Sequence, residues 1–383
     1  MLEVTRKLYY ENAYISEFSA RVVSCRACDG GFDTVLDKTA FFPEEGGQAS
    51  DCGYIGNARV SYVYERDGIV HHLTDSAPSD GEVLCRLDFD ERFEKMQLHT
   101  AEHILCGIIH RMYGLDNVGF HLGDDEVTFD ISSPLTREQL DAVEDAACEA
   151  VFANIKIETL FPTPEQLSEI EYRAKLDITE GIRLVRIGDV DTCACCAPHV
   201  ARTGEIGAIK MLHAERHRGG MRIWMTAGRR AVADYRNKFE NISRVGAMLS
   251  VPATDTADTL EKYMSDTEEL KYLLKESRRI YVKSLASTVE LTEGNVLELL
   301  FCVGIEELRM YVNYALSRVG GMLVAISGDE GDYKYVIGAK DMDLSAESKK
   351  INAALNGRGG GRGNMIQGSF SASIVDIKKY FGV

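Results

Sequence analysis

Two pairs of potential metal ligands stand far apart in this chain of 383 residues. His99 and His103 are four positions apart in a segment of helical pattern, so both imidazoles lie on one helix face. Cys195 and His199 add a thiolate and an imidazole, a ligand set that suits zinc better than magnesium or calcium. Because 92 positions separate His103 from Cys195, no local zinc finger explains them. The sequence therefore predicts one zinc ion per chain, at a site that the fold must first assemble.

Alternatives to this ligand set stay open. Any single histidine is more often a hydrogen-bonded core side chain than a ligand. Three cysteines lie close together, so Cys193 or Cys196 could replace Cys195 as the ligand. We prefer Cys195 because of its spacing to His199.

Two other interpretations of the histidine spacing, a metallopeptidase motif and a second metal site, are disfavoured. A metallopeptidase H-E-x-x-H motif would have its glutamate directly after the first histidine, where this chain has Thr100 and carries its carboxylate at Glu102. His213 and His217 form a second H-x-x-x-H, but they fall in a predicted strand, where four residues span roughly 13 Å. We assign that pair to the surface or to a face that contacts nucleic acid.

The residue patterns predict an α+β multidomain protein. Residues 1–88 alternate short β-rich runs with turns, as in a small antiparallel β-barrel. Residues 89–245 hold the ligands in an α+β domain that opens with a helix ending at Gly114 and continues with a helix after Thr136. Residues 246–287 read as a helical linker with apolar positions near a/d spacing, and residues 288–383 as a C-terminal α/β domain with a loop, GRGGGRGN.

Charge and hydropathy narrow the function classes. The net charge of −17 argues against a protein that coats nucleic acid non-specifically, although arginines gather in residues 202–230 and 349–363. The sequence has no apolar stretch long enough to cross a bilayer and no signal-peptide pattern at its N-terminus. Its ten cysteines lack a disulfide framework. We expect a cytoplasmic protein.

The motifs HTAEHIL and CCAPHV resemble the zinc motifs of the alanyl-tRNA synthetase editing domain and of its free-standing AlaX relatives. TAFFPEEGGQASDCG is similar to the family's glycine-rich barrel motif, and GRGGGRGNMIQGS to a segment of the DHH-associated C-terminal domain. The resemblance covers most of the chain and fits the long form, AlaX-L. Residues 196–198 depart from it, because the synthetase usually has glycines there.

The resemblance implies a zinc-dependent aminoacyl-tRNA deacylase. Its substrate would be alanine tRNA mischarged with serine or glycine, and the zinc ion would activate water or position the ester. Gln48 and the run Phe120, His121 and Leu122 are the expected pocket residues. The expected tRNA contacts are Arg216, Arg218, Arg222, Arg358 and Arg362. A homodimer would form through the linker helix and the C-terminal domain.

Two other functions remain possible from the sequence. One is a non-catalytic, zinc-stabilised RNA-binding protein, in which four protein ligands close the coordination shell. The other is editing of serine on threonine tRNA. The glycine segment 357–363 has two interpretations, a tRNA contact through its arginines or a plain surface loop. It lacks the spacing and the helix context of a P-loop or of a Rossmann motif.

Overall fold

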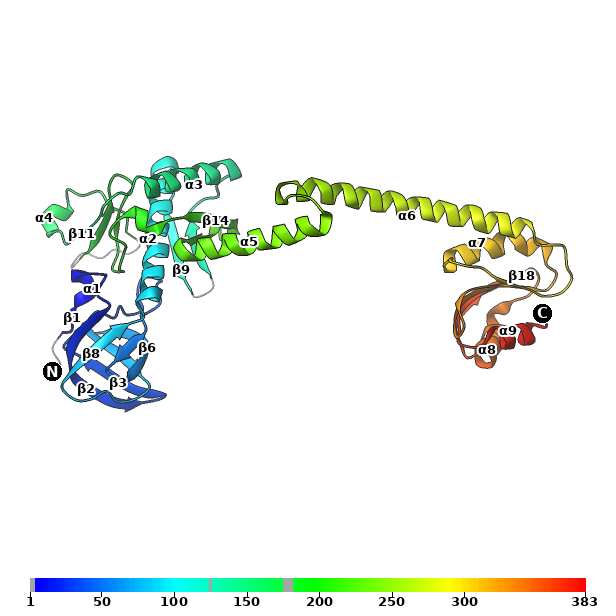
Figure 1. Cartoon of the computed structure of the whole chain (residues 1–383), viewed down its shortest axis with the longest axis horizontal. Helices are drawn as coiled ribbons and strands as arrows, with labels where there is room; N and C mark the ends of the chain where they lie inside the picture. The colour runs from blue at the N-terminus through cyan, green and yellow to red at the C-terminus, as the bar shows by residue number, and fades with distance from the viewer. Residues whose placement is uncertain (1–3, 124–125, 175–181) are drawn as a thin grey trace. The chain divides into compact units, whose positions relative to one another are not determined.

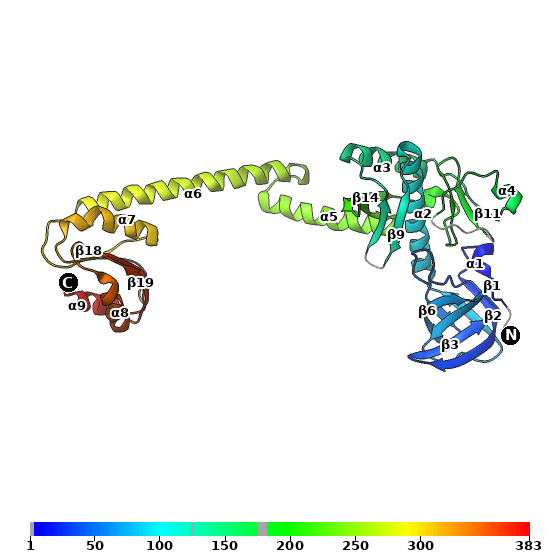
Figure 2. The same ribbon diagram turned by 180° about the vertical axis from the view of Figure 1, so that it is seen from behind.

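A computed structural model describes residues 4–123, 126–174 and 182–383, and it shows a mixed α+β protein (Figures 1 and 2). The chain divides into two compact units, Met1–Asn241 and Ile242–Val383. In the described residues, no helix is both long and apolar enough to span a membrane.

The first unit begins with a closed β-barrel. Its strands run in the order β2, β3, β7, β6, β5 and β8, with bounds Glu17–Cys28, Gly31–Leu36, Ile69–Thr74, Ala58–Arg66, Gly53–Ile55 and Glu82–Leu87. Inward-facing positions alternate with exposed ones, as in β8, and the inward side chains form a core that includes Phe41, Ile55 and Val63. Beside the barrel, β1 (Arg6–Lys7) pairs in parallel with β4 (Lys38–Thr39), and α1 (Leu8–Glu11) follows β1.

The helix predicted from Asp90 is confirmed as α2 (Phe89–Tyr113), which leaves the barrel and runs through the rest of the unit (Figures 1 and 2). Gly114 ends it in the left-handed conformation, with φ of 66° and its N–H bonded to the His110 carbonyl. Most of α2 is buried, because its apolar residues pack against helices and sheets on several sides. Such a central helix gives rigid support to a site.

Two sheets and one further long helix surround α2. One sheet has the order β14, β15, β10 and β9, with bounds Ile209–His217, Gly220–Ala227, Val127–Ile131 and Asn117–Leu122. The other has β11, β12 and β13, with bounds Ile157–Leu160, Leu184–Ile187 and Asp191–Ala194. The helix predicted after Thr136 is confirmed as α3 (Arg137–Phe152), with Thr136 and Gln139 forming a capping box. Short helices α4 (Pro164–Leu167) and η1 (Thr203–Ile206) lie in the connections.

Helix α5 (Gly228–Leu249) was not predicted, and it contains the boundary between the two units. After η2 (Ala253–Asp255), α6 (Thr256–Ser287) lies within residues 246–287, which the sequence predicts to be helical, and the role of this segment as a linker stays a prediction. Its expected a/d side chains are exposed in the single chain, among them Leu260, Tyr263, Leu270 and Leu274.

The rest of the second unit is a five-stranded sheet with helices. The strand order is β16, β17, β18, β20 and β19, with bounds Val296–Leu299, Met322–Asp329, Asp332–Ala339, Met365–Phe370 and Gly357–Arg362. Its helices are α7 (Ile305–Ala315), η3 (Leu316–Arg318), α8 (Leu344–Ala354) and α9 (Ile374–Phe381).

The glycine segment predicted as a loop is instead the edge strand β19, so that prediction was wrong. Gly359 faces β20 so closely that a Cβ would lie 2.3 Å from the Gln367 carbonyl oxygen. At Gly361 a Cβ would lie 2.4 Å from the Met365 carbonyl oxygen. The glycines therefore serve close strand pairing here, which the sequence pattern alone does not distinguish from a flexible loop.

Candidate metal centre

Helix α2 and the segment after β13 bring the four predicted ligands together. His99 and His103 lie one turn apart on α2 with ring centroids 5.2 Å apart. Cys195 and His199 follow β13, which pairs with β12 in the antiparallel sheet. One ligand atom from each of the four residues lies within 4.8 Å of all the others. The four side chains are buried or half-buried, so they could hold a metal ion away from bulk solvent.

The distances suit tetrahedral coordination. Cys195 Sγ lies 3.3 Å from His199 Nε2 and 3.7 Å from His99 Nε2. Zinc bonds of about 2.3 Å to sulfur and 2.0–2.1 Å to nitrogen, at tetrahedral angles, place such atoms about 3.6 Å apart. The cluster therefore needs only small shifts to close around an ion of this size.

Each histidine is oriented by a hydrogen bond at its Nδ1 atom. His99 Nδ1 donates to Gln48 Oε1 over 2.8 Å, and His103 Nδ1 donates to Asp191 Oδ2 over 3.1 Å. His199 Nδ1 lies 3.0 Å from the Thr100 hydroxyl, which itself donates to the Met96 carbonyl over 2.7 Å and so acts as acceptor for the ring. All three rings thus present Nε2 to the centre, which is the arrangement that metal-bound histidines use.

The pKa values in the cluster shift in different directions. Burial lowers the pKa of His103, but Cys193, Asp191 and Cys195 together hold it well above its usual value. Burial alone would raise the pKa of Cys195, but the adjacent His99 and His199 lower it well below its usual value. Burial lowers the pKa of His199 to about 3, so that ring is neutral near pH 7. A thiolate and a neutral imidazole are the forms in which cysteine and histidine bind metals.

Asp191 orients His103 and is itself held by Arg173. Its carboxylate accepts two hydrogen bonds of 2.8 Å from Arg173 while it also accepts from His103. Gly107 on α2 makes room for it, since a Cβ at that position would lie 2.6 Å from the Asp191 Cβ. The sequence analysis missed Asp191, although it lies in the same strand face as Cys193, in a D-x-C-x-C pattern that ends at Cys195.

Replacing Asp191 with asparagine is expected to weaken zinc binding about 10- to 100-fold, because His103 loses its charged orienting partner. Competition with a chelating dye measures the affinity. Asp130→Asn is the matched control, since Asp130 accepts two similar 2.8 Å bonds from Arg222 away from the cluster. Equal zinc affinity in wild type and Asp191→Asn would contradict the role given to Asp191.

Arg183 holds the segment that carries Cys195. Its guanidinium donates to the carbonyl oxygens of Cys195 and Ala197 over 2.6 and 2.9 Å, and the Cys195 N–H donates to the Arg183 carbonyl over 3.0 Å. These bonds fix the backbone of the ligand segment, including the positions that differ from the synthetase motif. Arg183 could not be found from a local sequence pattern, because its role depends on the pairing of β12 with β13.

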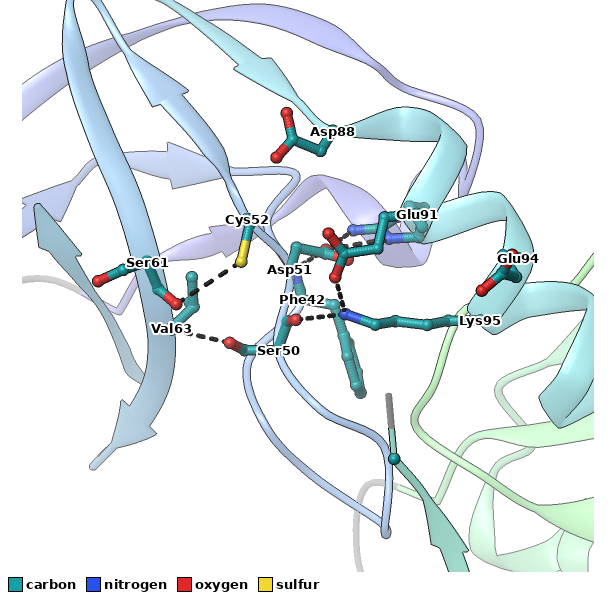
Figure 3. Close-up of polar contacts among 12 residues, drawn as sticks. Phe42, Ser50, Asp51, Cys52, Ser61, Val63, Asp88, Glu91, Glu94 and Lys95 are labelled. Atoms are coloured by element: carbon teal, nitrogen blue, oxygen red, sulfur yellow. Dashed lines mark hydrogen bonds and ion pairs between the residues drawn. The ribbon is translucent and has the colours of Figure 1, made fainter. Parts of the chain in front are cut away.

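The barrel loop that carries Gln48 is anchored to the first turns of α2 (Figure 3). Arg92 forms a buried ion pair with Asp51 and donates to the Ala40 carbonyl over 2.6 Å. Asp51 also accepts from the Phe42 N–H, and Lys95 donates to the Ser50 carbonyl over 2.8 Å. Arg92, Lys95 and His99 share one face of α2. The same helix face therefore positions both the loop and the first ligand.

Gln48 lies at the end of this anchored loop, as the sequence analysis suggested. Its side chain is fully buried and touches His99, so it orients a ligand. Gly47 allows the loop to approach β9, because a Cβ there would lie 2.6 Å from the Phe120 carbonyl oxygen. The Leu122 N–H donates to the Gly47 carbonyl over 2.9 Å.

The three residues of the expected pocket run on β9 lie in different surroundings. The Phe120 ring lies 4.8 Å from the His99 ring, between centroids, and thus borders the cluster. His121 is exposed and Leu122 is buried in the core beneath α2, so neither lines the cavity described below. Side chains alternate along a strand, so three consecutive residues cannot all face one pocket.

A cavity of about 280 Å³ lies beside the cluster. Among the described residues, its walls include His99, His103 and Cys195 together with Tyr10, Ile182 and the carboxylates of Glu45 and Glu102. This space is large enough for a small aminoacyl group. Tyr10, Glu45, Glu102 and Ile182 were not predicted as pocket residues, because they come from four separate segments.

The two cysteines near Cys195 in the sequence, Cys193 and Cys196, differ in their surroundings. Cys193 lies with His103 and Asp191 in a second group of close ligand atoms, behind the first. Cys196 lies outside both groups, and burial raises the pKa of its thiol. The geometry favours Cys195 as the thiolate ligand.

The five arginines expected to contact tRNA lie on strands and turns. Arg216 and Arg218 are exposed at the end of β14, whereas Arg222 on β15 is half-buried and engaged by Asp130. Arg358 and Arg362 are exposed on β19, four positions apart and so on the same face of the strand. Among these five arginines, Arg222 is the one that the described residues show in an ion pair, with Asp130.

Comparisons with known proteins show what this chain is similar to. Residues 182–223 match the family "Threonyl and Alanyl tRNA synthetase second additional domain". The alanyl-tRNA editing protein AlaX-L of Pyrococcus horikoshii is 26% identical over 98% of this chain and 96% of its own length. Over nearly its whole length this chain is similar to an AlaX-L protein. That confirms the resemblance drawn from its sequence motifs.

The chain is also similar to part of larger proteins. The alanine–tRNA ligases of Halobacterium salinarum and Pyrococcus abyssi are 32% and 30% identical over 89% and 99% of the chain. The chain spans 39% and 43% of the length of those ligases. Among solved structures, the C-Ala domain of Aquifex aeolicus alanyl-tRNA synthetase matches 23% of the chain at 19% identity, with a TM-score of 0.20.

Proposed function

We propose that this chain is a trans-editing aminoacyl-tRNA deacylase that hydrolyses serine, and also glycine, from mischarged alanine tRNA. The observation that carries the proposal is the convergence of three Nε2 atoms and one thiolate sulfur beside a cavity of about 280 Å³. The alanyl-tRNA editing named for the AlaX-L relative supports the assignment.

Zinc is the metal that suits this donor set, because nitrogen and sulfur ligands in a tetrahedral arrangement favour it. His99, His103, Cys195 and His199 would hold it, with Gln48, Asp191 and Thr100 orienting the rings. When bound, the ion supplies Lewis-acid chemistry to the ester or to water. The chain itself provides a cavity of about 280 Å³ beside the ligand candidates, whose size would limit the acyl group to small side chains.

The basic side chains exposed on two parts of the chain would bind tRNA. We assign Arg216 and Arg218 of the first unit and Arg358 and Arg362 of the second unit to phosphate contacts, because they are exposed and Arg222 is engaged with Asp130.

Replacing Arg358 and Arg362 together with glutamine is expected to weaken tRNA binding and to reduce the slope of log affinity against log salt by about two, one per lost phosphate contact. Filter binding at several salt concentrations measures this slope. The control is Arg137→Gln with Arg279→Gln, two exposed arginines on helices. An unchanged slope would remove β19 from the tRNA-binding surface.

The substrate assignment is tested by a panel of charged tRNAs. We expect fast deacylation of seryl-tRNA(Ala), slower deacylation of glycyl-tRNA(Ala), and sparing of alanyl-tRNA(Ala). If seryl-tRNA(Thr) is the faster substrate, the threonine alternative replaces ours. Sparing of every charged tRNA would refute the deacylase proposal.

One observation favours a second candidate, a zinc-stabilised RNA-binding protein. Four protein ligands are typical of structural zinc, whereas catalytic sites usually have three protein ligands and water. Tight tRNA binding without deacylation, and unfolding when zinc is removed, would support it.

We also propose that the protein acts in the cytoplasm and that it forms homodimers. The exposed apolar side chains of α6, such as Leu260, Leu270 and Leu274, would then be covered by the second copy. Sedimentation at several concentrations tests this, and a monomer at all of them would exclude it.

A further inference from the structure

An exposed aromatic side chain, Phe161, lies next to the wall of the cavity beside the metal centre. Tyr10 lines this cavity, and its ring centroid lies 6.1 Å from that of Phe161 at an interplanar angle of 63°. Phe161 is 58% exposed, so a large part of its ring is open to solvent. The function proposed above does not involve this side chain.

The pairing of β11 with β12 explains the position of Phe161. Leu160, the last residue of β11, pairs with Leu184, the first residue of β12, so the antiparallel register places Phe161 beside Arg183. Arg183 lines the cavity and holds the ligand segment through the Cys195 carbonyl. The fold thus places an exposed ring next to the backbone that carries a ligand candidate.

The backbone around Phe161 is restrained on its C-terminal side. Pro162 follows Phe161 and favours an extended backbone there. Thr163 then caps α4, since its hydroxyl accepts from the Gln166 N–H over 3.4 Å and the Gln166 side chain accepts from the Thr163 N–H over 2.9 Å. Phe161 therefore lies on a short, braced connection, and its ring is positioned before a ligand binds.

The Tyr10 ring is already engaged by cations. The Lys7 ammonium and the Arg183 guanidinium lie 5.5 and 5.4 Å from its centre, at cation–π distances, and Lys7 also pairs with Glu65. Tyr10 thus supports Phe161, which is the ring with open surface. Aromatic rings beside cationic groups are the combination with which proteins bind single-stranded nucleic acid.

We propose that Phe161 stacks on the 3′-terminal nucleobase of the charged tRNA. This inference rests on the deacylase function proposed above. In an aminoacyl-tRNA the ester is attached to the terminal ribose, and the same ribose carries the terminal base. An acyl group held in the cavity therefore brings that base to the adjoining surface, where Phe161 lies. Unpaired bases stack readily on aromatic side chains.

The consequence is affinity for an unpaired 3′ end without a choice among tRNAs. Stacking tolerates different bases, because every base has a π face. Phe161 would hold the terminal nucleotide and so direct its ester toward the ligand cluster. Recognition of a particular tRNA would come from other parts of the chain.

The test changes both partners of the proposed stack. The two substrates are seryl-tRNA(Ala) and the same charged tRNA with a terminal nucleotide that lacks its base. Deacylation is measured under single-turnover conditions with subsaturating full-length, zinc-loaded wild type, Phe161→Ala and Phe161→Trp. Phe152→Ala is the matched control, because Phe152 is also exposed, at 73%, at the end of α3. Zinc content and circular dichroism are measured for each variant.

We expect Phe161→Ala to slow deacylation of the complete substrate roughly 5- to 150-fold, the range that one stack of a base on an aromatic ring supplies. Removal of the base should slow wild type by a similar factor, and on that substrate wild type and Phe161→Ala should be equal. Phe161→Trp should keep most of the rate, and Phe152→Ala all of it.

Equal slowing of both substrates by Phe161→Ala would overturn the inference, since a purely structural role acts with or without the base. An unchanged rate of Phe161→Ala on the complete substrate would overturn it as well, and so would a wild type that hydrolyses both substrates equally fast. Failure of wild type to hydrolyse complete seryl-tRNA(Ala) would instead refute the deacylase function itself.

Discussion

Replacing Cys195 with alanine is expected to abolish zinc retention and to slow deacylation of seryl-tRNA(Ala) by at least about 100-fold. Loss of an outer-shell partner alone costs 10- to 100-fold, and Cys195 supplies the only thiolate in the four-residue cluster. The variant leaves three imidazoles without the negative charge that compensates the ion. Zinc content by elemental analysis and single-turnover rates measure the two effects.

Three other cysteine variants make this prediction specific. Cys28→Ala removes an exposed barrel thiol and should leave zinc content and rate unchanged. Cys193→Ala and Cys196→Ala separate the ligand candidates that the sequence left open, and both should retain zinc. If Cys195→Ala keeps its zinc and Cys193→Ala loses it, then the ligand assignment is wrong.

Replacing Arg92 with methionine is expected to reduce the free energy of unfolding by about 3–5 kcal/mol, the usual cost of leaving one member of a buried ion pair without its partner. Arg92 is 1% exposed, and its loss would leave the Asp51 carboxylate uncompensated between the barrel and α2. Denaturant unfolding followed by circular dichroism measures the change. Zinc affinity should fall too, because the loop carrying Gln48 loses its anchor.

The matched control is Arg137→Met, which breaks an exposed pair with Asp141 and should cost less than about 1 kcal/mol. The double variant Arg92→Met with Asp51→Asn should recover part of the lost stability, since it removes the buried charge as well. Equal stability of Arg92→Met and Arg137→Met would show that the buried pair does not hold the barrel to α2.

The four ligand candidates could be predicted from sequence, and so could Gln48 beside them, whereas the other residues that orient the candidates could not. His99 and His103 follow helical spacing, and Cys195 and His199 form a second short motif, so local pattern was sufficient. Asp191 and Arg183 act through the pairing of β12 with β13, and Asp51 reaches Arg92 across 41 positions. Such contacts depend on how elements pack, which periodicity does not encode.

The errors have equally local causes. The glycines of β19 were interpreted as a loop because a strand that needs close approach and a flexible segment share the same composition. On β9, His121 is exposed on the opposite face from Phe120, whereas Leu122 lies on the same face as Phe120 and is buried in the core, so the pocket role of this run stays a prediction. Helix α5 was missed, since its start at Gly228 directly follows β15 without an intervening turn signal. The bounds of the four predicted domains stay predictions.

The most direct test of the account is deacylation of seryl-tRNA(Ala) measured against zinc occupancy in one preparation of the full chain. We predict that the rate falls in proportion as a chelator removes zinc, that circular dichroism shows an intact fold, and that one equivalent of zinc restores the rate. Full activity at negligible zinc occupancy, with the fold intact, would contradict the account.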